Sequence, residues 1–225
     1  MVSLIQPNRI VLSALGTLAG AFFALAPVFL VQRGSPRLFD HWQELVFFAL
    51  CIVGGGVSGA VGFSLSPGER ELRRQRTIVW AGAGFFFLYE ACSALCEKLQ
   101  LGALNFELWR NLGLALLFAG AILRVWSIAT LGRFHSGLVA IQPEHQLITS
   151  GPYRRLRHPS YLGVLMALTA LPMIFGTWFP LLALPGVFVA LKWRITDEEA
   201  LLISHFGKEY EAYKSKTWRL VPYFY

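Results

Sequence analysis

The sequence predicts an all-α, polytopic integral membrane protein, a helical bundle of about six apolar segments in which the last two form a short hairpin, followed by a C-terminal amphipathic helix. Hydrophobic residues make up 55% of the 225 residues, charged residues only 15%, and the mean hydropathy is +0.52. A soluble fold is implausible at this composition. The net charge of +7 is concentrated between the apolar runs, which is typical of membrane topology rather than of nucleic-acid binding.

Four apolar runs of about twenty residues come first, each long enough to cross a hydrocarbon core of about 30 Å. They cover residues 10–31, 44–65, 78–96 and 112–130. The first run is longer than the apolar region of a signal peptide, so we expect a retained helix. Gly16 and Gly20, like the glycines at 54–56, are spaced for close contact between helices.

The distribution of basic residues predicts the orientation in the membrane. The segment 67–76 is the most basic of the early loops, and placing it in the cytoplasm makes both the N- and C-termini cytoplasmic. Few cations then remain outside, namely Arg33, Arg37, Lys98 and Arg110. No targeting signal is recognised, so we expect a bacterial inner membrane. Within the spans, Glu90 and Arg124 are functional candidates, although Arg124 can also snorkel towards the headgroups.

The last two apolar runs, residues 160–175 and 178–193, are shorter and contain three prolines, Pro172, Pro180 and Pro185. With Gly176-Thr177 between them, they predict a tight helical hairpin that spans thinly or dips in and returns. Both ends of this hairpin are cytoplasmic. The segment 151–163 and the C-terminal segment are therefore expected to lie together.

Segment 151–163 is basic, aromatic and rich in turn signals. Gly151-Pro152 predicts a turn, and His158-Pro159 predicts the start of a helix with Pro159 at its first position. Arg154, Arg155 and Arg157 add cationic donors at the same place. The arrangement favours an anion-binding site, while the simpler interpretation is a basic loop held by lipid headgroups.

The segment after Trp193 permits two interpretations. Thr196 and Glu199 have capping-box spacing, which predicts a new amphipathic helix over 200–216 on the membrane face. Its apolar stripe would contain Leu202, Phe206, Tyr210 and Tyr213. If the preceding helix instead continues, Arg194 and Glu198 share one face at i,i+4, as an ion pair or as a substrate clamp.

No metal site is predicted. Cys51, Cys92 and Cys96 lie inside apolar runs, and their odd number also argues against a disulfide framework. We find no glycine-rich phosphate loop and no Ser/His/Asp arrangement.

Two segments in combination, His145 to Gly163 and Arg194 to Tyr213, resemble the isoprenylcysteine carboxyl methyltransferase family and the related membrane phospholipid N-methyltransferases. The resemblance covers about residues 112–222, and residues 1–111 match no recognised motif. It divides the chain into N-terminal membrane helices, 1–111, and a membrane methyltransferase domain, 112–225, with a cytoplasmic cofactor site. One position departs from the family, because a polar residue is replaced by Leu138, for which Gln142 is a possible substitute.

This resemblance implies an integral membrane enzyme that uses S-adenosyl-L-methionine to methylate a lipid-like acceptor from the bilayer. The acceptor is expected to be an isoprenylcysteine-type or related isoprenoid carboxylate. Arg194 and Glu198 are the implied catalytic residues, with Arg194 facing the substrate carboxylate. The implied cofactor-binding residues are His145, Gln146, Leu147, Ile148, Tyr153, Arg157, His158, Ser160, Tyr161 and Glu198. The chemistry agrees, because displacement on a sulfonium needs positioning more than acid or base, and a carboxylate nucleophile needs only a cation to orient it.

Three alternatives remain at this level. A phospholipid amine acceptor would need a base, for which Glu198 or His158 could serve. The ending from Arg219 to Tyr225 is similar to the tail of the NADPH-dependent sterol-type membrane reductases, which lack the run from Gly151 to Pro159. A non-catalytic membrane scaffold is the third.

Overall fold

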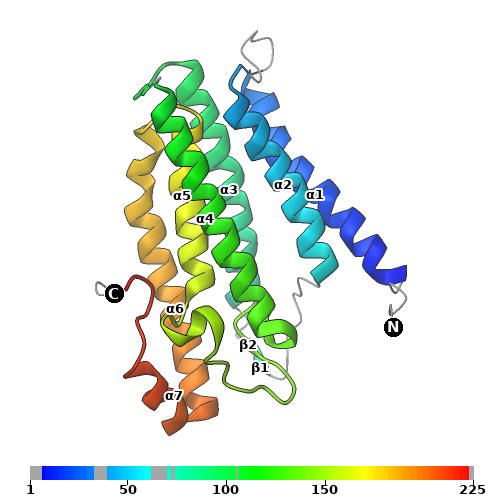
Figure 1. Cartoon of the computed structure of the whole chain (residues 1–225), viewed down its shortest axis with the longest axis vertical. Coiled ribbons are helices and arrows are strands. Elements are labelled where there is room, and N and C mark those ends of the chain that lie inside the picture. Colours follow the sequence, from blue (N-terminus) through cyan, green and yellow to red (C-terminus); the bar gives the residue numbers. More distant parts are fainter. Residues whose placement is uncertain (1–6, 33–39, 62–69, 72–73, 105, 223–225) are drawn as a thin grey trace. The chain divides into compact units, whose positions relative to one another are not determined.

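The computed structural model describes residues 7–32, 40–61, 70–71, 74–104 and 106–222, and it confirms the helical fold (Figure 1). Its helices are α1 Pro7–Gln32, α2 Trp42–Val61, α3 Arg74–Lys98, α4 Glu107–Leu131, α5 Pro159–Ile174, α6 Leu184–Phe206 and α7 Lys208–Lys214. Shorter elements are the strands β1 Arg70–Glu71 and β2 Ala140–Ile141 and the 3-10 turns η1 Gly132–Phe134, η2 Gly151–Arg154 and η3 Phe179–Ala183. Arg33, Arg37 and much of the basic segment 67–76 lie outside the described residues.

Among the described residues, four helical stretches are long and apolar enough to cross a membrane: Ala14–Gln32, Thr77–Lys98, Glu107–Phe134 and Phe179–Phe206. Two further apolar helices, Trp42–Val57 and Pro159–Ile174, are shorter. Large apolar side chains such as Leu18, Trp80 and Ile122 are exposed on these helices, which suits contact with lipid.

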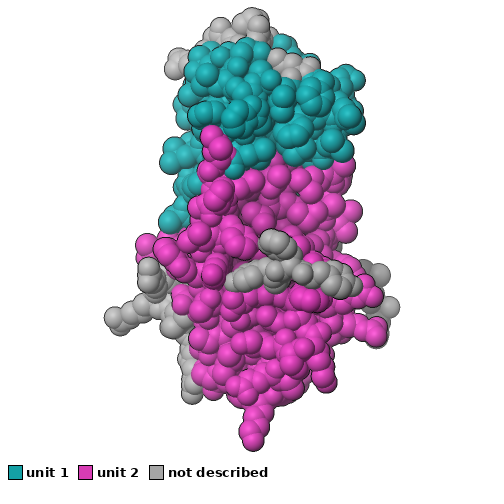
Figure 2. Space-filling view, turned by 90° about the vertical axis from the view of Figure 1, so that its left-hand side faces the viewer, with its two compact units in different colours: residues 1–63, 81–114, 171–181 teal, residues 64–80, 115–170, 182–225 magenta. Residues whose placement is uncertain are grey.

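The chain divides into two compact units (Figure 2). Unit 1 contains residues 1–63, 81–114 and 171–181, and unit 2 contains residues 64–80, 115–170 and 182–225. Helices α3, α4 and α5 contribute residues to both. The units are geometric, so the functional division near residue 112 stays a prediction.

Unit 1 contains a close glycine contact between α1 and α2, of the kind that the glycine spacing predicts without naming the partner helix. A Cβ atom on Gly20 would lie 2.5 Å from the Cys51 carbonyl oxygen, and one on Gly55 would overlap the Gly16 carbonyl oxygen. The two backbones therefore approach as closely as glycine permits.

The prediction that Arg110 ends a loop is wrong, whereas its location outside the membrane stays a prediction. It lies in the first turns of α4, only 2% exposed, because three acceptors surround it. Its guanidinium donates to Glu97 at 2.7 Å, to Glu44 at 3.3 Å and to the Ile174 carbonyl oxygen. The turn after α5 passes directly beside it, since a Cβ atom on Gly176 would lie 2.5 Å from Arg110 Nη2.

In unit 2, α4 and α5 cross at two glycines. A Cβ atom on Gly163 would lie 2.7 Å from the Gly120 carbonyl oxygen, and one on Gly120 would lie 2.9 Å from that of Gly163. The start of α5 also pairs with the C-terminal segment, because the amides of Arg157 and His158 donate to the carbonyl oxygens of Trp218, at 2.8 Å, and Arg219, at 3.1 Å. These contacts hold the start of α5 between α4 and the tail.

The predicted amphipathic helix over 200–216 is also corrected. Helix α6 runs straight on to Phe206, and Thr196 donates within it to the Lys192 carbonyl oxygen rather than capping a new helix. Gly207, with φ of +55°, ends α6, and α7 is a separate short helix beside it. Of the predicted apolar stripe, Tyr210 packs into the protein and is 1% exposed, while Leu202, Phe206 and Tyr213 are half-buried.

Candidate active site

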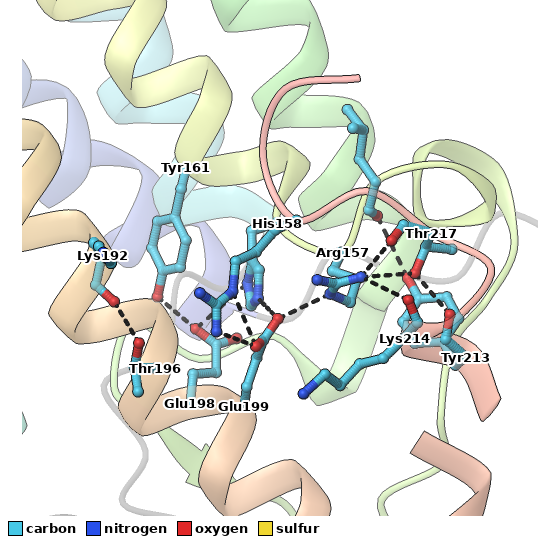
Figure 3. A network of polar contacts seen from close by, with 12 residues as sticks. Arg157, His158, Tyr161, Lys192, Thr196, Glu198, Glu199, Tyr213, Lys214 and Thr217 are labelled. Atoms are coloured by element: carbon cyan, nitrogen blue, oxygen red, sulfur yellow. Dashed lines mark hydrogen bonds and ion pairs between the residues drawn. The ribbon is translucent and has the colours of Figure 1, made fainter. Parts of the chain in front are cut away.

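The predicted site residues meet in unit 2 where the start of α5, the middle of α6 and the tail come together (Figure 3). As predicted, α5 begins at Pro159, whose missing N–H costs nothing in a first turn. That start places His158, Ser160 and Tyr161 side by side. Because α6 continues through residue 198, Arg194 and Glu198 stand one turn apart on the same face.

Tyr161 links the two predicted catalytic residues. Its hydroxyl donates to Glu198 Oε2 at 2.7 Å and accepts from Arg194 Nε at 2.8 Å. The guanidinium carbon of Arg194 also lies 5.7 Å from the centre of the Tyr161 ring, and Arg194 donates to the Gly137 carbonyl oxygen. Arg194 is thus held in a fixed orientation by a neutral hydroxyl and a carbonyl group.

Glu199 is a central residue that the sequence argument missed. It is 2% exposed, and three cationic or ionisable side chains converge on it. Arg157 Nε lies 2.8 Å and His158 Nε2 3.3 Å from Oε1, while Arg219 Nη2 lies 2.5 Å from Oε2. Its interpretation as part of a capping box concealed this role. The signal that could have revealed it is the second acid beside Glu198 on a helix that does not end there.

His158 lies between the two carboxylates. Its Nδ1 is 3.9 Å from Glu198 and its ring stacks on Tyr161 with centroids 5.6 Å apart. Arg157 reaches in the other direction, to the carbonyl oxygens of Lys214, at 3.0 Å, and of Thr217. Consequently, the Arg157-His158 pair connects α6 to the C-terminal tail.

The other predicted cofactor residues surround this network on neighbouring loops. His145 stacks on Phe134 at 4.9 Å, and burial together with the neighbouring His205 lowers its pKa, which favours a neutral ring. Burial, followed by the charge of Glu198, raises the pKa of Tyr153, whose carbonyl oxygen accepts from the Tyr213 hydroxyl at 2.7 Å. Gln146 is exposed, and Leu147 and Ile148 are half-buried.

Arg124 and Gln142 lie near the network, and the structure adds to what the sequence indicated for each. Arg124 does not extend away to headgroups, because its Nη1 donates to Ser160 Oγ at 3.0 Å. Burial, followed by the charge of Arg124, lowers the pKa of the adjacent His135 to about 4, so His135 is neutral at physiological pH. Leu138 is buried, and the side-chain amide nitrogen of Gln142 has no hydrogen-bond partner among the described residues.

Comparison with known proteins identifies the family. The model of the isoprenylcysteine carboxyl methyltransferase family matches residues 112–204. Protein-S-isoprenylcysteine O-methyltransferase A of Arabidopsis thaliana is 34% identical over 137 residues, covering 57% of this chain and 68% of that protein. The chain belongs to the isoprenylcysteine carboxyl methyltransferase family. The family segment includes Tyr153 to Tyr161 and Arg194 to Glu199, so most of the network lies within it.

For other relatives, the chain spans a smaller share of the relative's length. The Schizosaccharomyces pombe protein-S-isoprenylcysteine O-methyltransferase is 33% identical over 52% of this chain, and the chain spans 51% of its length. Enzyme B of Arabidopsis thaliana is 34% identical, with 59% of its length spanned. A solved eukaryotic intramembrane Ras methyltransferase, isoprenylcysteine carboxyl methyltransferase, shares the fold, with a TM-score of 0.50 at 22% identity over 96% of this chain and 75% of that one. The present chain belongs to this family and has apolar helices long enough to cross a membrane, so it is an integral membrane protein.

Proposed function

We propose that this chain is an integral membrane methyltransferase that transfers a methyl group from S-adenosyl-L-methionine to the carboxylate of an isoprenylcysteine-type or related isoprenoid lipid. The observation that supports this most directly is the hydrogen-bonded chain from Arg194 through Tyr161 to Glu198, inside the segment that matches the family. In this proposal, Arg194 is a fixed cation for an anionic acceptor, and the neighbouring Glu198 is a carboxylate for a positively charged cofactor.

The residues present fit such a cofactor. Its sulfonium and its amino group carry positive charge, and the Glu198 side chain, 30% exposed, is an anion that a ligand can reach. The rings of Tyr153 and Tyr161 offer aromatic faces to the same charge or to the adenine. We assign His145 to Ile148, Tyr153, Arg157 to Tyr161 and Glu198 to cofactor binding, with Arg157 acting through Glu199. When bound, the cofactor supplies an already activated methyl group, so the protein contributes positioning.

Arg194 favours a carboxylate acceptor over an amine. A carboxylate is ionised at neutral pH, and a guanidinium can orient both of its oxygens. An amine would be repelled while protonated and would require a base. The names of the similar relatives agree, since they are O-methyltransferases. We rank the phospholipid amine and the reductase alternatives below the carboxyl reaction for these reasons.

The proposed setting is the cytoplasmic side of a bacterial inner membrane, with both termini in the cytoplasm. The basic segments of the sequence support this orientation. A prenylated or lipid acceptor would enter from the bilayer, with its charged end at Arg194.

The test is methyl transfer by the purified protein in lipid nanodiscs, with labelled S-adenosyl-L-methionine and either a prenylcysteine acid or phosphatidylethanolamine. We expect label in an organic-soluble, base-labile ester on the prenylcysteine. Arg194→Ala should lower the rate at least 100-fold, about 2.7 kcal/mol of transition-state binding. Lys192→Ala, an exposed cation on the same helix, should leave it unchanged. Base-stable label on phosphatidylethanolamine, or a rate insensitive to Arg194, would overturn the proposal.

A further inference from the structure

Arg124 is a cation inside the membrane-spanning part of α4, and its charge is not matched by a nearby acid. Its Nη1 donates to the neutral hydroxyl of Ser160 at 3.0 Å, and it forms no ion pair with an Asp or Glu among the described residues. An arginine at membrane depth is costly, and such residues usually face a partner or a functional site. The Arg194 guanidinium, by comparison, is already oriented by Tyr161 and Gly137.

The backbone fixes where Arg124 lies. Helices α4 and α5 touch at Gly120 and Gly163, and a Cβ atom on Gly163 would lie 3.1 Å from Arg124 Cβ. The arginine side chain therefore runs along α5 towards its first turn, where it meets Ser160. This is the turn that also carries Tyr161.

The surroundings of Arg124 belong to the active site. The groups that interact with its charge are the Tyr161 and Tyr153 hydroxyls, Arg194 and His135. Arg124 from α4 and Arg194 from α6 thus both interact with Tyr161, and the two positive charges repel one another. An anion bound beside Tyr161 would offset both that repulsion and the cost of burying Arg124.

We propose that Arg124 is a second carboxylate-binding residue of this site, acting with Arg194 on an anionic group beside Tyr161. The inference rests on the proposed function, which brings two carboxylates to the site, one on the lipid acceptor and one on the amino-acid end of the cofactor. Either would satisfy the same chemistry, and binding measurements separate them.

The experiment compares ligand pairs that differ only in or around the carboxylate. S-adenosylhomocysteine is compared with 5′-methylthioadenosine, which lacks the amino-acid end, and a prenylcysteine acid is compared with its methyl ester. Affinities are measured by calorimetry in nanodiscs for wild type, Arg124→Gln and Arg124→Lys. The matched control is Arg133→Gln, an exposed arginine nearby that pairs with Glu144 at 3.3 Å.

Arg124→Gln should weaken one carboxylate ligand at least tenfold and its carboxylate-free counterpart less than twofold, with partial recovery in Arg124→Lys and no change in Arg133→Gln. Selective loss of S-adenosylhomocysteine assigns the cofactor carboxylate, and selective loss of the prenylcysteine acid assigns the acceptor. Equal effects on both members of a pair, or no effect, would overturn the inference. Because binding needs no turnover, a selective effect stands even if wild type transfers no methyl group to prenylcysteine, which would sink only the proposed function.

Discussion

Two neighbouring carboxylates on α6 differ sharply in their surroundings. Glu199 is buried and contacts Arg157, His158 and Arg219, so its negative charge is paired with side chains of the protein. The side chain of Glu198 is partly exposed and accepts from the Tyr161 hydroxyl. The first residue therefore belongs to the framework of the site, and the second remains available to a ligand.

This difference predicts opposite effects of two matched substitutions. Glu199→Gln leaves Arg157 and Arg219 without their counter-charge, and we expect a loss of about 3 kcal/mol in the free energy of unfolding, typical of breaking a buried pair. Glu198→Gln should melt like wild type but bind S-adenosylhomocysteine at least tenfold more weakly. Thermal unfolding in detergent and calorimetry check both. The reverse pattern would show that the two roles are assigned the wrong way round.

Single residues also show where sequence reasoning stops. Pro159 begins α5 as predicted, because proline at the first helical position is a local signal. The roles of Arg110, Arg124 and Glu199 depend on partners 66, 36 and 42 positions away, namely Glu44, Ser160 and Arg157. Sequence spacing predicts contacts only between residues a few positions apart, so the sequence could not predict these partners.

Among the elements, the crossing of α4 and α5 places two helices in backbone contact near the site. The carbonyl oxygens of Gly120 and Gly163 occupy the space that side chains would need. Arg124 and Ser160 meet about one turn from this crossing, at the end nearer the start of α5. Any widening of it should therefore act on the site as well as on packing.

We expect Gly163→Ala to destabilise the protein by about 2 kcal/mol, as overpacked positions do, because the new methyl group would meet backbone 2.7 Å away. Gly186→Ala on α6 is the control, since a Cβ atom there has no atom within 4 Å. It should be neutral or slightly stabilising, because alanine favours a helix. Melting of both variants in the same detergent is the measurement. Equal melting temperatures would mean that the crossing is looser than described.

Prediction was more successful for elements than for side chains. The positions of the apolar runs gave the membrane helices because length and hydropathy are local properties. For α6 the sequence left two interpretations open after Trp193, and the structure shows the continuing helix, which ends at Phe206. Arg194, Glu198 and Glu199 remain helical there because Tyr161, Arg157 and Arg219 satisfy their charges.

For the molecule as a whole, the two units contain separate polar clusters. Arg110 with Glu44 and Glu97 lies in unit 1, whereas every contact of the candidate active site described above lies in unit 2. Stability and ligand binding should therefore respond separately to substitutions in the two clusters.

Arg110→Met tests this separation. It leaves Glu44 and Glu97 buried without their cation, so we expect a loss of about 3 kcal/mol in the free energy of unfolding. The affinity for S-adenosylhomocysteine, measured below the melting temperature, should stay within twofold of wild type. A large loss of affinity in the folded variant would contradict the separation.

The pairing of the tail with α5 has a consequence for how the protein is made. Arg219 follows Glu199 by 20 residues, so the buried acid of α6 gains this partner only when the tail folds back onto the helix. The set of cations around Glu199 is complete only when Arg219 is in place. A purification tag is therefore better placed ahead of α1 than next to the residue 219 contact.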